Sequence, residues 1–178
     1  IRGSFTFACW AKLNHLPSTV AHAPQYNLCG ARISTKDSMQ IIVTANNKVS
    51  LQFEGDNDDN LNTTTDDVIF DAIDVYKHIA VTVTKNGGGN TGVIIYVNGL
   101  AVATTDIGAL TEANHNGYTS TQPLYIGGTS INAGTGLTGS MDGCIYDFAI
   151  WSETLTAANI LKAYNTGVAF DLTADDGN

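Results

Sequence analysis

The sequence predicts an all-β fold in which antiparallel strands form a sandwich or a barrel, with one short helix near the C-terminus. Apolar and polar residues alternate through 49–53 and through several other runs, which is the period of a half-buried strand. Asn98-Gly99 separates two such runs and predicts a hairpin, because a type I′ turn needs positive φ at both central residues. Consecutive strands therefore pair antiparallel, and a parallel α/β sheet is not expected.

The predicted strands are short runs rich in β-branched and aromatic residues, bounded by turn-forming residues. Asn46-Asn47 predicts a second tight hairpin, and the Gly-rich stretch 85–90 predicts a longer loop. In chain order, the predicted strands are 5–12, 28–34, 39–45, 49–53, 78–84, 93–97, 100–105, 124–127 and 143–151.

One segment changes to a helical period. Thr156 is a suitable N-cap for a helix over 157–165, and Gly167 is a typical residue just after a helix C-terminus. A helix this short is marginal in isolation, so we expect its apolar face to pack on the sheets. We expect one domain over 1–167, with 168–178 as a tail, an extra strand or a linker.

Length and charge limit the classes of function. The chain has 178 residues, the size of one domain, with 8 basic and 17 acidic residues and a net charge of −9. This balance argues against nucleic acid or an anionic membrane surface as a partner. No apolar run approaches the ~20 residues that a membrane span needs, so no membrane insertion is expected. The chain begins in a strand-like run, so we expect a processed or excised piece of a longer protein.

The three cysteines are Cys9, Cys29 and Cys144. An odd number excludes complete intramolecular pairing, and the spacing fits neither a disulfide framework nor a zinc site. Two alternatives stay open. Cys9 and Cys144 can pair, since the first and last strands of a sandwich often meet, or all three can be small buried apolar residues.

Several motifs occur in the order found in one family. The order and spacing of these motifs resemble LamG-like and pentraxin-related domains of the concanavalin A-like lectin/glucanase superfamily. The matching segments are Ser4-Phe5-Thr6-Phe7-Ala8-Cys9-Trp10, Tyr76-Lys77-His78-Ile79-Ala80-Val81-Thr82, Ile95-Tyr96-Val97-Asn98-Gly99, Leu124-Tyr125-Ile126-Gly127 and the run from Gly143 to Trp151 followed by Leu155 to Asn165.

The resemblance implies a jelly-roll sandwich of two antiparallel sheets, closed by a C-terminal strand and helix. Members of the family are mostly non-catalytic recognition or adhesion modules, commonly glycan-binding and sometimes calcium-dependent. Ala80 stands where pentraxins have a cysteine, so their disulfide cannot form here. Their calcium positions correspond to Tyr26-Asn27 and to 129–131, which hold one amide and hydroxyl groups in place of acids. Calcium-bridged ligand capture of the pentraxin kind is therefore not expected.

Calcium has two other candidate positions. Asp56, Asp58 and Asn60 alternate like the first half of an EF-hand loop, but Leu61 stands where that loop needs glycine. A calcium loop of another kind and a solvated acidic loop are the two alternatives there. Asp147 occupies an acidic position of the family in the last strand, where some relatives hold a structural calcium. A hydrogen-bonded aspartate explains Asp147 equally well.

Catalysis is not expected. Retaining glucanases of this fold place their carboxylates as E-x-D-x-x-E on one strand, whereas Glu54, Glu112 and Glu153 are far apart here. The four histidines show no spacing for a metal or a catalytic triad, and His78 is explained as an outward residue of its strand. No serine has the context of a nucleophile elbow.

Ligand recognition is expected in long loops on the rigid sandwich. Tyr118 and Asn116 lie in the long loop 111–122, and Tyr125 begins the next strand, so these three are the candidate ligand-binding residues. Trp10 and Trp151 match core positions of the family and are expected to be buried.

Two functions remain open. The first is a non-catalytic recognition or adhesion module of an extracellular, cell-surface or virion-surface protein, binding a glycan or another surface polymer. The alternative is a structural decoration or filament-assembly domain, whose partners are sister subunits. Fold does not decide between them.

Overall fold

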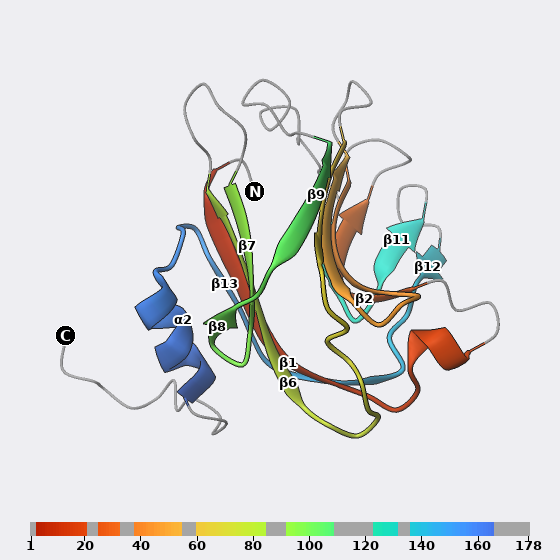
Figure 1. Ribbon diagram of the computed structural model, residues 1–178. Coiled ribbons are helices and arrows are strands. Elements are labelled where there is room, and N and C mark those ends of the chain that lie inside the picture. The colour runs from red at the N-terminus through yellow and green to blue at the C-terminus, as the bar shows by residue number, and fades with distance from the viewer. Residues whose placement is uncertain are drawn as a thin grey trace.

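Two antiparallel sheets pack face to face, and one helix lies outside one of them (Figure 1). The computed structural model describes residues 3–20, 25–32, 38–54, 60–84, 92–108, 123–131 and 136–165. The predicted all-β sandwich with a short C-terminal helix is confirmed. Within these residues, no helix has both the length and the apolar character that crossing a membrane requires.

The five-stranded sheet brings the two ends of the domain together. The first strand of the chain, β1, lies between β6 and the last strand, β13, and pairs antiparallel with both. In spatial order the strands are β13 (Gly143–Trp151), β1 (Phe5–Leu13), β6 (Lys77–Thr84), β7 (Gly92–Val97) and β8 (Leu100–Ala101).

The six-stranded sheet is largely a run of consecutive antiparallel strands. A separate hairpin of β11 (Thr129–Ile131) and β12 (Gly136–Thr138) lies beside β2, and the short helix η1 (Pro17–Thr19) follows β1. In spatial order the sheet contains β10 (Tyr125–Ile126), β2 (Gln25–Arg32), β3 (Ser38–Thr44), β4 (Val49–Glu54), β5 (Asn60–Thr65) and β9 (Thr104–Gly108).

Two expectations about strands are wrong. The single strand expected over 100–105 is divided: Leu100–Ala101 belongs to the five-stranded sheet and Thr104–Gly108 to the other, so the chain crosses between the sheets here. The strand Asn60–Thr65 was not expected, because its sequence is polar almost throughout. It forms because Leu61 joins the core and Thr63 lies on the buried face opposite Leu51.

The core lies between the sheets and is built from alternate residues of each strand. Phe5 of β1 meets Phe53 of β4 edge to face, with ring centroids 6.1 Å apart, so the two sheets are in direct aromatic contact. Phe70, in the connection between β5 and β6, is fully buried in the same cluster. Full burial of each such side chain stabilises the fold by about 1.5–3 kcal/mol.

The pairing of β1 with β13 contains a β-bulge. Ala8 pairs with Ala149 and Trp10 with Tyr146, so two residues of β13 stand opposite one residue of β1. The extra residue is Asp147, whose φ of 49° lies in the left-handed region that aspartate tolerates better than most residues. The bulge interrupts the regular ladder of an edge strand, and such irregularity discourages pairing with another chain.

All three cysteines are free, so the alternative in which Cys9 and Cys144 pair is wrong. Cys9 is buried in the core, whereas Cys144 is exposed and pairs with Lys12 rather than with a residue next to Cys9. Cys29 is also buried in the core, and burial raises the pKa of its thiol to about 12. Both core cysteines are therefore protonated, unreactive thiols at neutral pH.

The helix α2 (Ala157–Tyr164) packs on the outer face of the five-stranded sheet. The hydroxyl of Thr156 accepts a hydrogen bond from the Asn159 backbone N–H, as expected for the N-cap. The helix ends at Asn165 in the left-handed region, two residues before the expected stop at Gly167. Ile160 is buried against Ala8 and its neighbours, because small side chains on the sheet let the helix approach closely.

A single hydroxyl joins the start of the domain to the segment that leads into the helix. Thr6 is fully buried on the outer face of β1, and its Oγ1 donates to the Glu153 carbonyl at 2.8 Å. The same oxygen accepts from the Leu155 backbone N–H, also at 2.8 Å. The segment between β13 and α2 is therefore held to β1 through this one side chain.

We predict that Thr6→Val destabilises the protein by about 1–3 kcal/mol, because valine has the same shape but removes two partly buried hydrogen bonds, to the Glu153 carbonyl and from the Leu155 N–H. Thr82→Val is the matched control: Thr82 pairs with Thr6 on the neighbouring strand and is equally buried, but its hydroxyl makes only a 3.5 Å contact with the Ile94 carbonyl. Urea unfolding of both variants measures the difference. Equal losses of stability would contradict the role assigned to Thr6.

Candidate ligand-binding face

One row of directly opposed residues crosses all six strands of the larger sheet on its outer face. Opposed residues on paired strands point to the same side of a sheet, and the neighbours Ile41 and Leu51 point into the core. The row therefore faces outward. From β10 to β9 it reads Tyr125, Gly30, Gln40, Gln52, Asn62 and Ile107.

The centre of this row consists of three adjacent side-chain amides, Gln40, Gln52 and Asn62, which we call the amide row. Gln40 is only 3% exposed, whereas Gln52 and Asn62 are partly exposed. An amide presents both donors and acceptors in one plane, so three neighbouring amides form a polar surface suited to a hydrogen-bonding ligand. Ile107 is 67% exposed and continues the row on the edge strand.

Two oxygen atoms at the deep end of the row have no hydrogen-bond partner among the residues that the structure describes. They are Oε1 of Gln40 and Oγ1 of Thr129, and both side chains are almost completely buried. A buried polar group without a partner costs about 1–3 kcal/mol, so such atoms point to a missing partner. A ligand that supplies a donor can meet that need.

Gly30 explains why these two side chains come together. A Cβ atom at this position would lie 2.8 Å from Thr129 Oγ1 and 3.3 Å from Gln40 Cγ. Only glycine leaves room for β11 to pass this close to β2. The absent side chain thus lets both Thr129 and Gln40 pack against the backbone of Gly30.

The neighbouring rows have partners of their own. Ser50 and Thr64 share a hydrogen bond of 2.8 Å, and Ser38 donates to Glu54 Oε2 at 3.0 Å. Glu54 is the charged residue whose side chain is described within the paired strands of this face, whereas Lys48 and Asp66 lie at its far end, where Asp66 accepts from the Thr105 hydroxyl. Asn27 Oδ1 on β2 and Thr63 Oγ1 on the core side of β5 are also buried without partners in the described part of the chain, but Gln40 and Thr129 are the two that lie against Gly30.

Of the ligand-binding residues expected from the sequence, the structure places Tyr125 in the row, opposite Gly30 and partly buried. Tyr118 and Asn116 lie outside the described residues and stay predictions. The amide row itself was not foreseen. The polar positions of β3 and β4 were visible in the alternation, but their lateral alignment with Asn62 depends on β5, which the sequence did not reveal.

The candidate calcium positions do not converge in the described part of the chain. Asp56 and Asp58 lie outside it, and of Asn60 only the backbone is described, in β5 opposite Glu54. Asp147 is exposed on the bulge of β13, in the other sheet. Within the described residues, no three acidic, histidine or cysteine side chains gather as a metal site would require. Calcium binding stays a prediction.

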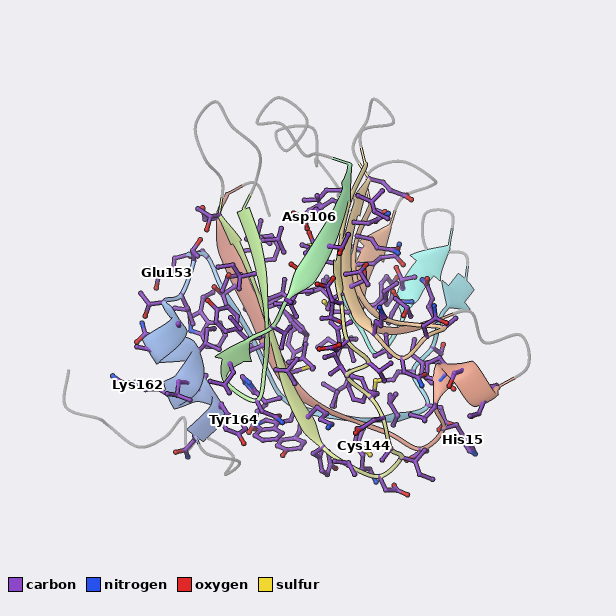
Figure 2. The ribbon with its side chains drawn as sticks, in the orientation of Figure 1. His15, Asp106, Cys144, Glu153, Lys162 and Tyr164 are labelled. Carbon is purple, nitrogen blue, oxygen red and sulfur yellow. The ribbon has the colours of Figure 1, made fainter. Side chains whose placement is uncertain are left out.

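A second cluster of interest lies on the outer face of the five-stranded sheet, beneath the end of α2. Trp10 stacks between Tyr146 and Tyr164, with centroid distances of 5.8 and 5.5 Å, and meets His78 at 5.4 Å. Tyr164 also contacts His78, and the ring of Tyr76 packs edge to face against that of Tyr146. Figure 2 shows Tyr164 at the lower end of the helix. These rings contact one another, which indicates that the cluster holds the helix on the sheet.

Trp10 is buried as expected, although it lies beneath the helix and not between the sheets. His78 is 2% exposed, and burial lowers the pKa of its imidazole to about 4. His78 Nδ1 and Trp10 Nε1 have no hydrogen-bond partner within the described residues. His78 is therefore neutral at physiological pH, and charging it opposes the native packing.

Comparison with known proteins agrees with this geometry. A family model described as the concanavalin A-like lectin/glucanases superfamily, Laminin_G_3, matches residues 2–161. The chain belongs to the concanavalin A-like lectin/glucanase superfamily. The resemblance inferred from the motifs is thus confirmed, and the match reaches into α2; the boundary at 167 stays a prediction. A search of curated proteins finds none whose sequence matches significantly.

Solved structures of the superfamily's fold include recognition modules. The CBM40 module of the Ruminococcus gnavus IT-sialidase has a TM-score of 0.67 and 14% identity, covering 91% of this chain and 83% of that one. It has also been solved with α2,3-sialyllactose bound. A heptameric SAP-like pentraxin from Limulus polyphemus has a TM-score of 0.57 and 17% identity, covering 90% and 69%.

The receptor-binding domain of botulinum neurotoxin D is a third similar structure, with a TM-score of 0.61 and 12% identity. The alignment covers 94% of this chain but 38% of the toxin domain. At these identities the likeness establishes the concanavalin A-like fold alone.

We predict that Gly30→Ala destabilises the protein by about 1–3 kcal/mol, because the new methyl group must displace Thr129 or Gln40. Gly128→Ala is the matched control, since a Cβ there meets only Ser140 Oγ, at 4.0 Å. Thermal unfolding compares the two. A neutral Gly30→Ala would show that β11 does not pass this close to β2.

We predict that stability falls as the pH is lowered from 6.5 towards 4. In this range the unfolded chain, with an ordinary histidine pKa near 6.5, binds a proton at position 78 that the folded protein excludes. The full effect corresponds to about 3–3.5 kcal/mol. Unfolding free energies at pH 6.5 and 5 should differ less in His78→Gln than in the parent, and an equal difference in the two proteins would contradict the role assigned to His78.

Proposed function

We propose that this chain is a non-catalytic glycan-binding module of an extracellular or surface protein, with its ligand seated on the amide row. One observation carries the proposal: Gln40 Oε1 and Thr129 Oγ1 are buried acceptors without partners, at the deep end of a surface of partly exposed amides. Sugar hydroxyls are donors of the kind that these two oxygens lack, and a small turn of the Gln40 side chain is needed to present its oxygen to a ligand. The rest of the row supplies further hydrogen bonds.

The row also offers apolar contact at both ends. Tyr125 lies at one edge of the sheet and the exposed Ile107 at the other, with the three amides between them. A pyranose has an apolar face and a rim of hydroxyls, so it matches aromatic or aliphatic contact beside planar amides. Binding requires no covalent step, only a preformed surface.

The carboxylates support a binding role over hydrolysis. Glycoside hydrolysis needs two carboxyl groups about 5–9.5 Å apart across the scissile bond. Glu54 is on the outer face of the six-stranded sheet, whereas Glu153 follows β13 on the five-stranded sheet, where Figure 2 labels it. The other described carboxylate at the ligand face, Asp66, contacts Thr105 in the row of Ser50, which is four residues or about 13 Å along β4 from Glu54 and outside the catalytic range.

The similar structures support recognition as the kind of function. One is named a carbohydrate-binding module, solved with sialyllactose, and another a receptor-binding domain. The surface location belongs to this proposal, because glycan ligands are displayed there. The alternative, a decoration or assembly domain that contacts sister subunits, stays a prediction that the oligomeric state in solution can test.

We predict saturable binding to at least one glycan on an array of diverse oligosaccharides. Gln52→Ala and Asn62→Ala should each weaken that binding about five- to tenfold, the worth of one hydrogen bond, and Gln40→Ala should weaken it further. Lys162→Ala is the control, because Lys162 lies on α2, outside the other sheet (Figure 2).

Circular dichroism must show that each variant is folded. The proposal fails if no glycan binds, or if the three amide variants bind as well as the parent. Tyr118→Ala, measured in parallel, tests separately whether the loop residue predicted from the sequence takes part.

A further inference from the structure

We infer that the ligand of the amide row is an uncharged glycan and that sialylated or sulfated glycans are excluded. This inference rests on the proposed function and concerns the chemical class of the ligand. It follows from which atoms lack partners and from where the charges on the described residues lie.

The first step is the match of donors and acceptors. Gln40 Oε1 can only accept a hydrogen bond, and it lies at the buried end of the row beside Thr129 Oγ1. A sugar hydroxyl can donate to it. A carboxylate or sulfate group carries acceptors alone. The Thr129 hydroxyl can donate to such a group, but Gln40 Oε1 would face it acceptor to acceptor in a poorly solvated environment. The deep end of the site therefore selects a hydroxyl.

The second step is the charge beside the row. Glu54 follows Gln52 by two residues on β4, so both lie on the same face, about 6–7 Å apart along the strand. Ser38 donates to one carboxylate oxygen of Glu54 but does not neutralise its charge. An anionic ligand group lying across the row would face this like charge, at a distance where repulsion is strong in a partly buried site.

The third step is that no unpaired counter-charge lies beside the amide row among the described side chains. Lys162 is on α2 beyond the opposite sheet, and Lys48, just before β4, lies on this face but four residues from Gln52, with its Nζ bonded to the Asp66 carbonyl at 2.6 Å. The other two described lysines are held by the carboxylates of nearby aspartates: Lys12 by Asp74 at 2.8 Å and Lys77 by Asp71 at 3.2 Å.

The net charge of −9 adds a long-range bias in the same direction, because it lowers the local concentration of anionic ligands. The R. gnavus module solved with sialyllactose shares 13% identity with this chain. At that distance a fold can keep its recognition role while the residues on its ligand face select a different class of glycan.

The test compares matched pairs of glycans. Calorimetry measures binding of lactose and 3′-sialyllactose, and of neutral glucose-, mannose- and N-acetylglucosamine-terminated oligosaccharides with their sialylated or sulfated counterparts. We expect a neutral member to bind, and its charged counterpart to bind at least tenfold more weakly. Glu54→Gln should narrow that ratio, because it removes the charge and keeps the shape. Glu153→Gln, outside the other sheet, should leave the ratio unchanged.

The outcomes separate the two proposals. Equal or tighter binding of the charged counterpart, or a ratio that Glu54→Gln does not alter, overturns this inference and leaves the glycan-binding function standing. Arg32→Ala then shows whether that residue, whose backbone pairs with Ser38 next to Glu54, supplies the cation. Failure of every glycan to bind overturns the proposed function and this inference with it.

Discussion

The arrangement of this protein depends on the position of its first strand. Because β1 hydrogen-bonds to β6 on one side and to β13 on the other, the beginning of the domain becomes an interior strand of a sheet completed by its end. Alternate residues of β1 then serve two layers. Phe5 and Phe7 fill the space between the sheets, while Thr6, Ala8 and Trp10 face outward. These three hold, respectively, the segment leading to the helix, the helix itself, and the aromatic cluster beneath its end.

The outer faces of the two sheets differ for a physical reason. On the five-stranded sheet, alanines and stacked rings form an apolar seat that is buried by α2, so that face is used by the chain itself. On the six-stranded sheet, a line of amides ends at two buried oxygens with no partner in the described residues. Polar groups of this kind stabilise nothing within the chain, and leaving them unpaired costs free energy. The atoms Trp10 Nε1 and His78 Nδ1 of the other sheet, which are also unpartnered within the described residues, are covered by α2, whereas the amides beside Gln40 are partly exposed, and this exposure is why the proposed ligand is placed on the six-stranded sheet.

Much of the fold could be predicted from local patterns. The hairpin at Asn98-Gly99 is present, with both residues at positive φ, and the N-cap at Thr156 forms the expected hydrogen bond. The family motifs are confirmed by the match over residues 2–161. The strand predictions failed at two segments whose structure is set by contacts with distant strands and not by their own residue pattern. The polar strand β5 forms because it pairs with β4. The chain crosses between the sheets within 100–105, and the alternation of apolar and polar residues there does not indicate the crossing.

The sequence by itself determined which residues alternate, where turns and the helix begin, and to which superfamily the chain belongs. The first two depend on residues that are neighbours in the chain, and the third depends on motifs that occur in a fixed order. The tertiary structure decided which residues stand side by side. Gln40, Gln52 and Asn62 come from three strands, and Thr129 reaches them only because Gly30 lets a distant hairpin approach. Lateral neighbours depend on strand order and register, which long-range pairing sets. No local pattern contains that information, so the candidate ligand face emerged only with the fold.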